Sequence, residues 1–316
     1  MTARNASCTA VIVAYNNAAT IRACLVSLFE YSTVSLQVVV VDNSPGTNQG
    51  DETASAVKVF AAENPEKSVR LIRRPDNIGF AAGCNLGAKN AQSEYLLFFN
   101  PDARCDNDLP GILTNFLRQR GDVRVAGPQI CDSQGRIVAT CRNLATPFRI
   151  FCDATGLDRL LGVYRLLHFR HDRPRSVDQV IGACMAMRRT DFESMDGFDE
   201  RFFIYFEEVD LCKRVLDAGA AVWFYPSARA VHIGGVSLES ASMLDRMPLL
   251  LRRSRAQYFA KHYGIVPQFL VHAITIAESL GKGLVLFALS FVQPARSTER
   301  RARARGFFAV LKEWGV

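Results

Sequence analysis

One stretch near residue 100 decides the fold that we expect: Tyr95-Leu96-Leu97-Phe98-Phe99-Asn100-Pro101-Asp102. Five apolar or aromatic residues follow one another and stop at a turn, which is typical of a central parallel strand buried on both faces. Pro101 cannot donate to a sheet, so the strand ends before it. Asp102 is then expected at the carboxyl end of that strand, where open α/β sheets bind ligands. Taken alone, Asn-Pro-Asp also fits an ordinary turn.

Three earlier segments repeat the pattern of a buried strand followed by a helix. The predicted strands are Thr9–Ala14, Gln37–Val41 and Val69–Arg73, and the predicted helices are Thr20–Tyr31, Thr53–Glu63 and Phe80–Ala91. This alternation predicts an α/β fold with a mostly parallel, doubly wound sheet and helices on both faces. Right-handed crossovers bring the strand ends to one edge, so we expect Asn16, Asp42, Asp76 and Asp102 along it.

The glycines of the third predicted helix do not form a dinucleotide-binding fingerprint. Gly79, Gly83 and Gly87 are four residues apart instead of following Gly-x-Gly-x-x-Gly, which disfavours a Rossmann dehydrogenase. On a helix this spacing places the three glycines near one face. We therefore expect close packing there, or close approach of a ligand near the helix start.

The middle of the chain gives weaker signals. We expect a helix over Asp108–Arg120, a strand over Val123–Gly127, a hairpin over Ile130–Thr140 that turns at Asp132–Gly135, an irregular connection over 141–176, and strands over Val177–Met187 and Trp223–Pro226.

A predicted helix from about Glu207 to Ala218 carries a carboxylate on its apolar face. At 100° per residue Glu208 falls in the middle of the apolar arc, whereas Asp210 and Arg214 fall opposite it as an exposed i,i+4 pair. A carboxylate that faces a core is costly unless it has a partner or a function. Burial raises its pKa, which suits a general base. The alternative is that Glu208 only benefits from the helix N-terminus.

The composition suits a folded intracellular protein. The 316 residues are enough for one large α/β domain or two smaller ones, and the nine cysteines contain no Cys-x-x-Cys pair. An odd, unpatterned set of cysteines fits a reducing cytosol. Met1–Thr9 carries no signal-peptide pattern. We therefore expect a cytoplasmic protein.

The C-terminal region combines basic residues with apolar runs. From Arg246 onward twelve Lys and Arg residues stand against three acidic residues, while Ile265–Ala277 and Gly283–Ala295 carry no charge. Neither run reaches the 18 or so residues of a membrane-spanning helix. Amphipathic or re-entrant helices at the inner face of the cytoplasmic membrane are one interpretation. A helical subdomain packed on the sheet or across a homodimer interface is the other. Nucleic acid is disfavoured as a partner, because such tails are usually polar.

Four groups of motifs occur in a fixed order: Val11–Asn16; Val40–Ser44; Asn77–Asn85 with Asn100–Asp102; and Phe203–Cys212 with His232–Gly235. Together they resemble the family 2 inverting glycosyltransferases of the GT-A fold. The most similar subgroup is the rhamnosyltransferase-like enzymes of bacterial cell-surface polysaccharide assembly. The resemblance covers about residues 9–240. We expect a GT-A domain over residues 1–245 and a basic helical region over residues 246–316.

The resemblance implies a donor site at the strand ends. Asp42 would bind the base of the nucleotide sugar, with Asn16 and Asp76 beside it. The same donor site would include three further residues of the motifs, namely Asn77, Gly79 and Asn100.

The resemblance also implies a metal site and a general base. Asp102 stands at the family's Asp-x-Asp metal ligand, although Asn-Pro-Asp has one carboxylate fewer, and His232 would be a further contact to the metal or diphosphate. The implied cofactor is Mg²⁺ or Mn²⁺. Glu207-Glu208 stands where the family usually has Glu-Asp, so Glu208 would be the base, one methylene longer than usual, and Asp210 a supporting residue.

The implied reaction is transfer of a sugar from a dTDP- or UDP-sugar to a glycan or lipid-linked acceptor, with dTDP-rhamnose as the expected donor. Another hexose or galactofuranose is an alternative. A nucleotidyltransferase is a second class, but Tyr15–Ala19 lacks the Gly-rich basic loop expected of it. A non-catalytic nucleotide-sugar-binding protein is a third.

Overall fold

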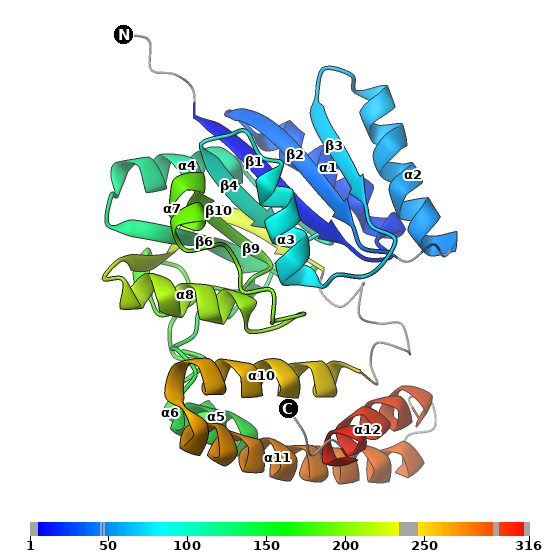
Figure 1. Ribbon diagram of the computed structural model, residues 1–316, viewed down its shortest axis with the longest axis vertical. Helices are drawn as coiled ribbons and strands as arrows, with labels where there is room; N and C mark the ends of the chain where they lie inside the picture. Colours follow the sequence, from blue (N-terminus) through cyan, green and yellow to red (C-terminus); the bar gives the residue numbers. More distant parts are fainter. Residues whose placement is uncertain (1–5, 45, 47, 234–245, 293–296, 313–316) are drawn as a thin grey trace. The chain divides into compact units, whose positions relative to one another are not determined.

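The computed structural model describes residues 6–44, 46, 48–233, 246–292 and 297–312 (Figure 1). Contacts within the chain separate two compact units. The sheet unit contains Met1–Leu144, Leu166–Glu200 and Glu207–Ser237, and the helical unit contains Ala145–Arg165, Arg201–Phe206 and Leu238–Val316. No sequence pattern predicted that 145–165 and 201–206 group with the C-terminal helices.

Within the described residues, ten strands form one sheet in the order β3-β2-β1-β4-β9-β6-β10-β5, with β7 beside β6 and β8 beside β10. The strands are β1 (Ser7–Ala14), β2 (Ser35–Asp42), β3 (Ser68–Arg73), β4 (Tyr95–Phe99), β5 (Ala103–Cys105), β6 (Val123–Cys131), β7 (Ile137–Val138), β8 (Arg175–Val177), β9 (Cys184–Arg188) and β10 (Ala221–His232). Strands β3, β2, β1 and β4 are parallel, whereas β9 runs antiparallel to both β4 and β6. The predicted mostly parallel α/β sheet is confirmed.

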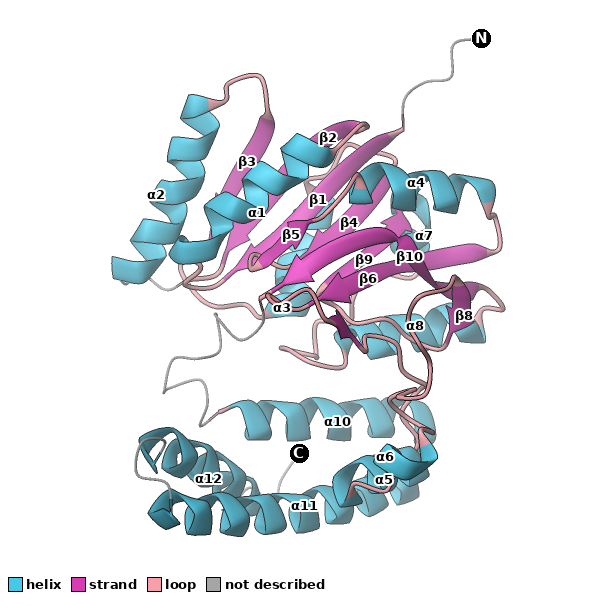
Figure 2. Ribbon diagram, turned by 180° about the vertical axis from the view of Figure 1, so that it is seen from behind, coloured by secondary structure: helices cyan, strands magenta, loops and turns pink. Residues whose placement is uncertain are grey.

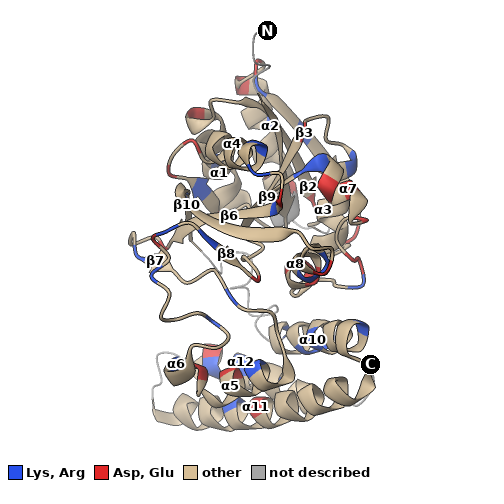
Figure 3. Cartoon of the chain, turned by 90° about the vertical axis from the view of Figure 1, so that its left-hand side faces the viewer, with Lys and Arg blue, Asp and Glu red and all other residues tan. Residues whose placement is uncertain are grey.

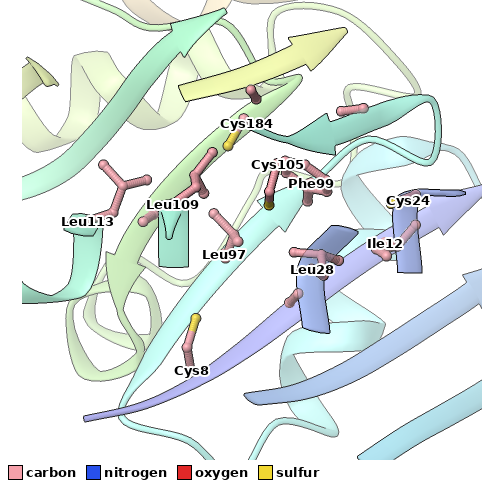
Figure 4. Packing of buried hydrophobic residues seen from close by; sticks show 14 of the residues in the cluster. Cys8, Ile12, Cys24, Leu28, Leu97, Phe99, Cys105, Leu109, Leu113 and Cys184 are labelled. Atoms are coloured by element: carbon pink, nitrogen blue, oxygen red, sulfur yellow. The ribbon is translucent and has the colours of Figure 1, made fainter. Parts of the chain in front are cut away.

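Helices cover both faces of the sheet (Figure 2). The helices of the sheet unit are α1 (Ala18–Tyr31), α2 (Asn48–Glu63), α3 (Phe80–Lys89), α4 (Leu109–Gln119), α7 (Arg189–Ser194) and α8 (Glu207–Asp217). Helices α1, α2 and α4 pack on one face in the cluster shown in Figure 4, and α3, α7 and α8 pack on the other. Strand β1 serves both layers, because Ile12 faces the first cluster and Val11 and Val13 face the second.

The glycines of α3 allow the helix to approach β1 closely. A Cβ at Gly83 would lie 2.9 Å from Cγ1 of Val13, and a Cβ at Gly87 would collide with Cγ1 of Val11. Gly79 precedes the helix with φ 87°, a conformation that favours glycine. The spacing of four therefore serves helix–sheet packing, as the sequence predicted.

Two predicted strands differ from those observed. Val177–Met187 was expected as one strand, but β8 ends at Val177 and β9 begins at Cys184. The two segments have different partners, since β8 pairs with β10 and β9 with β4. The expected short strand Trp223–Pro226 is instead the twelve-residue β10. The pairing of β10 with β6 shifts register between Tyr225 and Arg229, and this irregularity accommodates Pro226.

The connection 141–176 was expected to be irregular, but it contains two helices, α5 (Pro147–Thr155) and α6 (Asp158–Leu161). Thr146 caps α5, Pro147 opens it and Gly156 ends it in the left-handed conformation. The hairpin expected over Ile130–Thr140 is confirmed as β6 and β7.

The helical unit also contains α10 (Met247–Tyr263), α11 (Ile265–Val292) and α12 (Ser297–Lys312). The two apolar runs were expected to form separate helices, but residues 265–292 form one helix of 28 residues. Glu278 and Lys282 do not interrupt it, because they form an i,i+4 ion pair of 2.6 Å along the helix. By length and composition alone, α11 could cross a membrane.

Candidate active site

The first part of the site lies at the carboxyl ends of the parallel strands. Asp42, the last residue of β2, is opposite Ala14 of β1 and Arg73 of β3. It is fully buried, and its Oδ1 accepts a hydrogen bond of 3.0 Å from the backbone N–H of Ser44. Arg73 lies 3.7 Å from its Oδ2. The predicted meeting of the first two strand ends is therefore observed.

Three side-chain oxygens at these strand ends are buried acceptors. No described residue donates a hydrogen bond to Oδ1 of Asn16, Oδ2 of Asp42 or Oδ1 of Asn43. Asn16 has φ 57°, and its backbone N–H donates to Oγ of Ser44. Asn43 donates to the carbonyl of Gly79. Since buried polar groups normally have partners, these oxygens are suited to a ligand that carries N–H or O–H donors.

Asn77 and Gly79 shape the loop that enters α3. Oδ1 of Asn77 accepts from the backbone N–H of Gly79 at 3.0 Å, which forms an Asx turn. Asp76 lies in the same loop with an exposed side chain, 3.1 Å from Arg74. Asp76 is therefore at the surface near the end of β3, while Asp42 is in the interior.

The second part of the site is a cluster of Asn100, Asp102 and His232. Nε2 of His232 lies 3.0 Å from Oδ1 of Asp102 and 3.3 Å from Nδ2 of Asn100. Backbone pairing sets this contact, because His232 of β10 is opposite Ala103 of β5 and Ile233 donates to the carbonyl of Asp102. The structure places His232 as the last residue of β10.

The chemistry of Asp102 and His232 fits a divalent metal ion. Oxygen and imidazole ligands suit Mn²⁺, and Mg²⁺ prefers oxygen. Nε2 of His232 and Oδ1 of Asp102 lie 3.0 Å apart, so both groups are close enough to contact one ion. Within the described residues no group of three or more His, Cys, Asp or Glu side chains could hold a metal. The remaining ligands would have to come from substrate and water.

The third part of the site is the start of α8, where two adjacent carboxylates point inward. Glu207 is buried, Glu208 is partly buried, and no described residue donates a hydrogen bond to Oε2 of either. Burial, followed by the charge of Glu208, raises the pKa of Glu207 well above its usual value. Burial also raises the pKa of Glu208, although backbone N–H groups and Arg142 oppose this. Both carboxyls therefore retain protons more strongly than exposed glutamates.

The segment Gly182–Ala183 contacts both acidic parts of the site. The carbonyl of Ala183 accepts from the backbone N–H of Asn100 at 2.9 Å. A Cβ at Gly182 would lie 3.6 Å from the Glu208 side chain. Two consecutive residues thus connect the Asn100–Asp102 turn with Glu208, so the carboxylates at the strand end and on the helix belong to one region of the sheet unit.

One prediction about α8 is wrong. Asp210 and Arg214 form the expected i,i+4 ion pair at 2.8 Å, but Asp210 is fully buried instead of exposed. Arg214 also donates to the carbonyls of Met195 and Gly197, so the pair holds α8 to the preceding loop. A helical wheel could not reveal these backbone partners.

Asn85 is a structural residue of the site that the sequence analysis did not single out. Its side chain donates to the carbonyl of Phe198 at 2.8 Å and accepts from the N–H of the same residue at 2.9 Å. It also donates to Glu200 at 3.0 Å. These bonds fix the segment before α8 against α3. Its position at the end of the Asn77–Asn85 motif could have indicated in the sequence that Asn85 belongs to the site.

The two residues before Glu207 adopt a strained backbone. Tyr205 has φ 68° and Phe206 has φ 69°, values that are uncommon for bulky residues. Such conformations cost about 1–3 kcal/mol each and concentrate at functional sites. Their position directly before the paired carboxylates supports a functional role for the start of α8.

Comparison with known proteins decides the family. The model of "Glycosyl transferase family 2" matches residues 9–195, more than half of the chain. The chain belongs to glycosyl transferase family 2. A further model, "N-terminal domain of galactosyltransferase", matches residues 167–235, which include α8 and His232. The two matches together cover all three parts of the site.

Curated relatives of this family 2 glycosyltransferase include enzymes of glycan synthesis. It is 25% identical over 242 residues to the N-acetylglucosaminyl-diphospho-decaprenol L-rhamnosyltransferase of Mycobacterium tuberculosis, covering 70% of this chain and 74% of the relative. It is 26% identical over 144 residues to rhamnosyltransferase WbbL of Escherichia coli, covering 45% and 53%. A hexosyltransferase, Agl10 of Haloferax volcanii, is 26% identical over 191 residues, covering 58% and 55%.

Solved structures confirm the GT-A fold. The mannosyltransferase PcManGT of Pyrobaculum calidifontis, in complex with GDP-Man and Mn²⁺, aligns with TM-score 0.59 and 16% identity over 99% of this chain and 89% of its own. GalNAc-T7 with UDP, GalNAc and Mn²⁺ aligns with TM-score 0.56 and 14% identity, covering 82% of this chain and about half, 51%, of its own.

Proposed function

We propose that this family 2 glycosyltransferase moves a sugar, with inversion, from a nucleoside diphosphate donor to a hydroxyl of a glycan or lipid-linked glycan during cell-surface polysaccharide synthesis. L-Rhamnose from dTDP-rhamnose is the preferred donor sugar, because two of the relatives above are named rhamnosyltransferases. Another dTDP- or UDP-sugar, such as a hexose, is the alternative, supported by the named hexosyltransferase.

One observation carries the proposal: Ala183 accepts a hydrogen bond from Asn100 of the Asn100–Asp102 turn, and the backbone of the adjacent Gly182 hydrogen-bonds to Glu208. Inverting transfer needs two functions near one sugar. One group neutralises the leaving diphosphate, and another removes the proton of the attacking hydroxyl. Asp102 with His232 is suited to the first function, and Glu208 to the second.

The strand ends would bind the nucleotide. One oxygen each of Asn16, Asp42 and Asn43 accepts no hydrogen bond from the described residues, and thymine and uracil both present an N–H donor. Asp76 would lie beside the nucleotide at the surface. The turn formed by Asn77 and Gly79 and the side chain of Asn100 complete the proposed donor site.

The metal would be held by Asp102 and His232, with Mg²⁺ and Mn²⁺ as the candidates. When bound, a divalent ion stabilises the negative charge that develops on the leaving diphosphate. The chain's contribution is to hold the carboxylate and the imidazole together through the pairing of β5 with β10. Nε2 of His232 must be free of its proton to act as a ligand.

Glu208 would act as the general base and Glu207 would support it. The raised pKa of Glu208 makes its carboxylate a stronger proton acceptor than an exposed glutamate. Glu207 keeps its own proton more tightly, so only one of the two adjacent groups needs to be charged. The rate of transfer should accordingly rise with pH through a value above 4.5, the usual pKa of glutamate.

A donor screen tests the proposal. The full chain would be heated with dTDP-rhamnose, UDP-hexoses and dTDP, each with and without Mn²⁺ or Mg²⁺, and the true donor should raise Tm most in the presence of metal. Release of the nucleoside diphosphate with a lipid-linked glycan acceptor would then be measured as a function of pH. A nucleotidyltransferase would instead release pyrophosphate, and a binding protein would shift Tm without turnover. Either result would refute the proposal.

The proposal places the enzyme in the cytoplasm, at the inner face of the membrane. The cysteines of the described residues are all free. Free thiols fit a reducing compartment. Fractionation of cells would test this location, which predicts recovery with the cytoplasm or its membrane.

A further inference from the structure

Helix α11 has an inverted distribution of side chains. Its buried residues are small or polar, apart from one valine: Val271, Thr275, Ser279, Gly283 and Ser290. Large apolar residues are exposed instead, among them Phe269 at 66%, Leu284 at 53% and Phe291 at 62%. A helix of a water-soluble protein usually has the opposite arrangement.

Ten exposed apolar residues of α11 form one continuous stripe. At 100° per residue, an arc of about 100° contains every third or fourth residue along the whole of α11. We call this arc the apolar stripe; its members are Val266, Phe269, Leu270, Ala273, Ala277, Leu280, Leu284, Phe287, Ala288 and Phe291. All ten are exposed, and no polar residue of Ile265–Val292 falls within the arc. Figure 3 accordingly shows α11 with few charged positions.

The polar side of α11 is occupied by α10. The guanidinium of Arg255, buried on α10, donates to Oγ1 of Thr275 at 3.1 Å and to Glu278 at 3.0 Å. Arg252, also buried, lies 3.4 Å from Nε2 of His272. This face cannot turn to solvent without breaking a buried ion pair. The apolar stripe is therefore fixed outward.

The neighbouring helices exclude a spanning orientation. Helices α10 and α12 both pack on α11 (Figures 1 and 2). Helix α10 carries Arg252, Arg253 and Arg255, and α12 carries a run of arginines between Arg300 and Arg305. If α11 crossed a bilayer, these charges would lie beside it in the hydrocarbon, at a cost of several kcal/mol each. A helix lying in the plane of the membrane keeps α10, which packs on the polar side of α11, on the water side.

Basic side chains border the stripe at both ends. Lys261 is exposed just before α11 begins. At the other end the exposed Arg301 lies 5.3 Å from the ring centroid of Phe291, a member of the stripe. Arg303 and Arg305 are also exposed on α12. Basic residues beside an apolar helix face are complementary to anionic lipid headgroups.

Helices α5 and α6 add apolar surface beside α11. Phe148 is 61% exposed and Leu160 is 78% exposed. A groove of about 770 Å³ lies between α5 and α11, lined mainly by apolar residues that include Phe151 of α5 and Ala273 and Ala277 of the stripe. Exposed apolar surface thus extends over two segments more than 100 residues apart in the chain.

We propose that the apolar stripe of α11, extended by α5 and α6, docks in the plane of a bilayer that contains anionic phospholipids. Apolar side chains enter the headgroup–acyl boundary while the flanking arginines contact the headgroups. This deepens the membrane location given in the proposed function, on which it rests, and does not depend on which sugar is transferred.

Vesicle flotation of the full chain tests the proposal. Phosphatidylcholine vesicles would be compared with vesicles containing about three parts in ten of phosphatidylglycerol. The wild type should float with both and more strongly with the anionic vesicles. The double variant Leu280→Glu/Leu284→Glu should lose about tenfold or more of the bound fraction, because it places two charges in the stripe. The matched control is Val26→Glu/Val59→Glu, at positions of the sheet unit that are 40% and 46% exposed, and it should bind normally.

Three results would overturn the proposal: a wild type that does not float, a stripe variant that floats normally, or a control variant that loses binding equally. Sedimentation velocity without lipid tests for a second copy. A wild-type dimer that the stripe variant splits, with no vesicle binding by either, would make the stripe a dimer interface. Tm and the donor-dependent Tm shift, measured without lipid, should be unchanged in the stripe variant. A failure of membrane docking is therefore distinguishable from a failure of the proposed transferase activity.

Discussion

The sheet unit and the helical unit distribute polar and apolar side chains in opposite ways. In the sheet unit apolar residues fill both faces of the sheet, and polar groups with unpaired oxygens gather at the strand ends and at the start of α8. In the helical unit α11 directs polar residues inward, where Arg255 and Glu278 pair, and directs large apolar residues outward. A buried polar residue therefore indicates different things in the two units. Where its oxygen accepts no hydrogen bond, it indicates a ligand site; where it is hydrogen-bonded, it indicates a packing contact.

The largest effect is expected from Glu208→Gln, which removes the proposed base and keeps the shape of the side chain. Transfer should fall by about 10²–10⁴-fold, while the donor-induced Tm shift remains. Glu193→Gln, whose side chain is 56% exposed on α7, is the control and should transfer sugar normally. Normal transfer by Glu208→Gln would show that Glu208 is not the base. A buried carboxylate without a hydrogen-bond donor would then not indicate a functional site.

The next effect concerns the packing that holds the sheet unit together. In Gly87→Ala the new methyl group would collide with Cγ1 of Val11, so α3 must move away from β1. A loss of about 1–3 kcal/mol in the free energy of unfolding is expected in urea titrations. Gly121→Ala is the control, because its Cβ would meet no atom within 4 Å. Equal stability of the two variants would contradict the close-packing role of the α3 glycines.

A smaller effect is expected at the proposed metal ligands. His232→Ala should weaken Mn²⁺ binding by about 10–100-fold, measured as the metal concentration that gives half-maximal transfer and half-maximal Tm shift. The control is His168→Ala, at an exposed position of the sheet unit. If both variants respond to Mn²⁺ as the wild type does, the Asp102–His232 pair is a structural hydrogen bond and not a metal site.

The last prediction concerns pH and stability. Because the pKa of Glu207 is raised, the folded protein keeps this proton at pH values at which the unfolded chain has lost it. The free energy of unfolding should therefore fall as pH rises above about 4.5, the ordinary glutamate value, with a slope of up to about 1.4 kcal/mol per pH unit. Glu207→Gln should remove this part of the slope, whereas Glu193→Gln should retain it. Identical slopes for Glu207→Gln and the wild type would show that burial does not raise the pKa of Glu207.

The sequence predicted the parallel half of the sheet because its signals are local. The run Tyr95–Phe99 is typical of a central strand, and each preceding strand ends at a polar turn. Local sequence patterns also predicted that Asp42 lies at a strand end and that Glu208 faces inward, and both are observed. The antiparallel β9 was not predicted, since its direction depends on pairing with β4 across about 90 residues.

The remaining errors concern charged residues whose partners are distant in the sequence. Asp210 was assigned to an exposed face, but it is buried and paired with Arg214. The guanidinium of Arg214 also binds the backbone carbonyl of Met195. The charge-free runs before and after Glu278 were counted separately, but Arg255 of α10 pairs with Glu278 in the middle of α11. A helical wheel assumes that charge faces water, and it fails where another element supplies the opposite charge.

The position of β9 between β4 and β6 also determines when the two parts of the sheet can join during synthesis. Until Arg188 has left the ribosome, β4 has no neighbour on one side. Its sequence Tyr-Leu-Leu-Phe-Phe then forms an unpaired, aggregation-prone edge strand. A nascent chain that stalls before Cys184 is therefore expected to aggregate or to need a chaperone. The late-made strand is what converts two separate partial sheets into a single one.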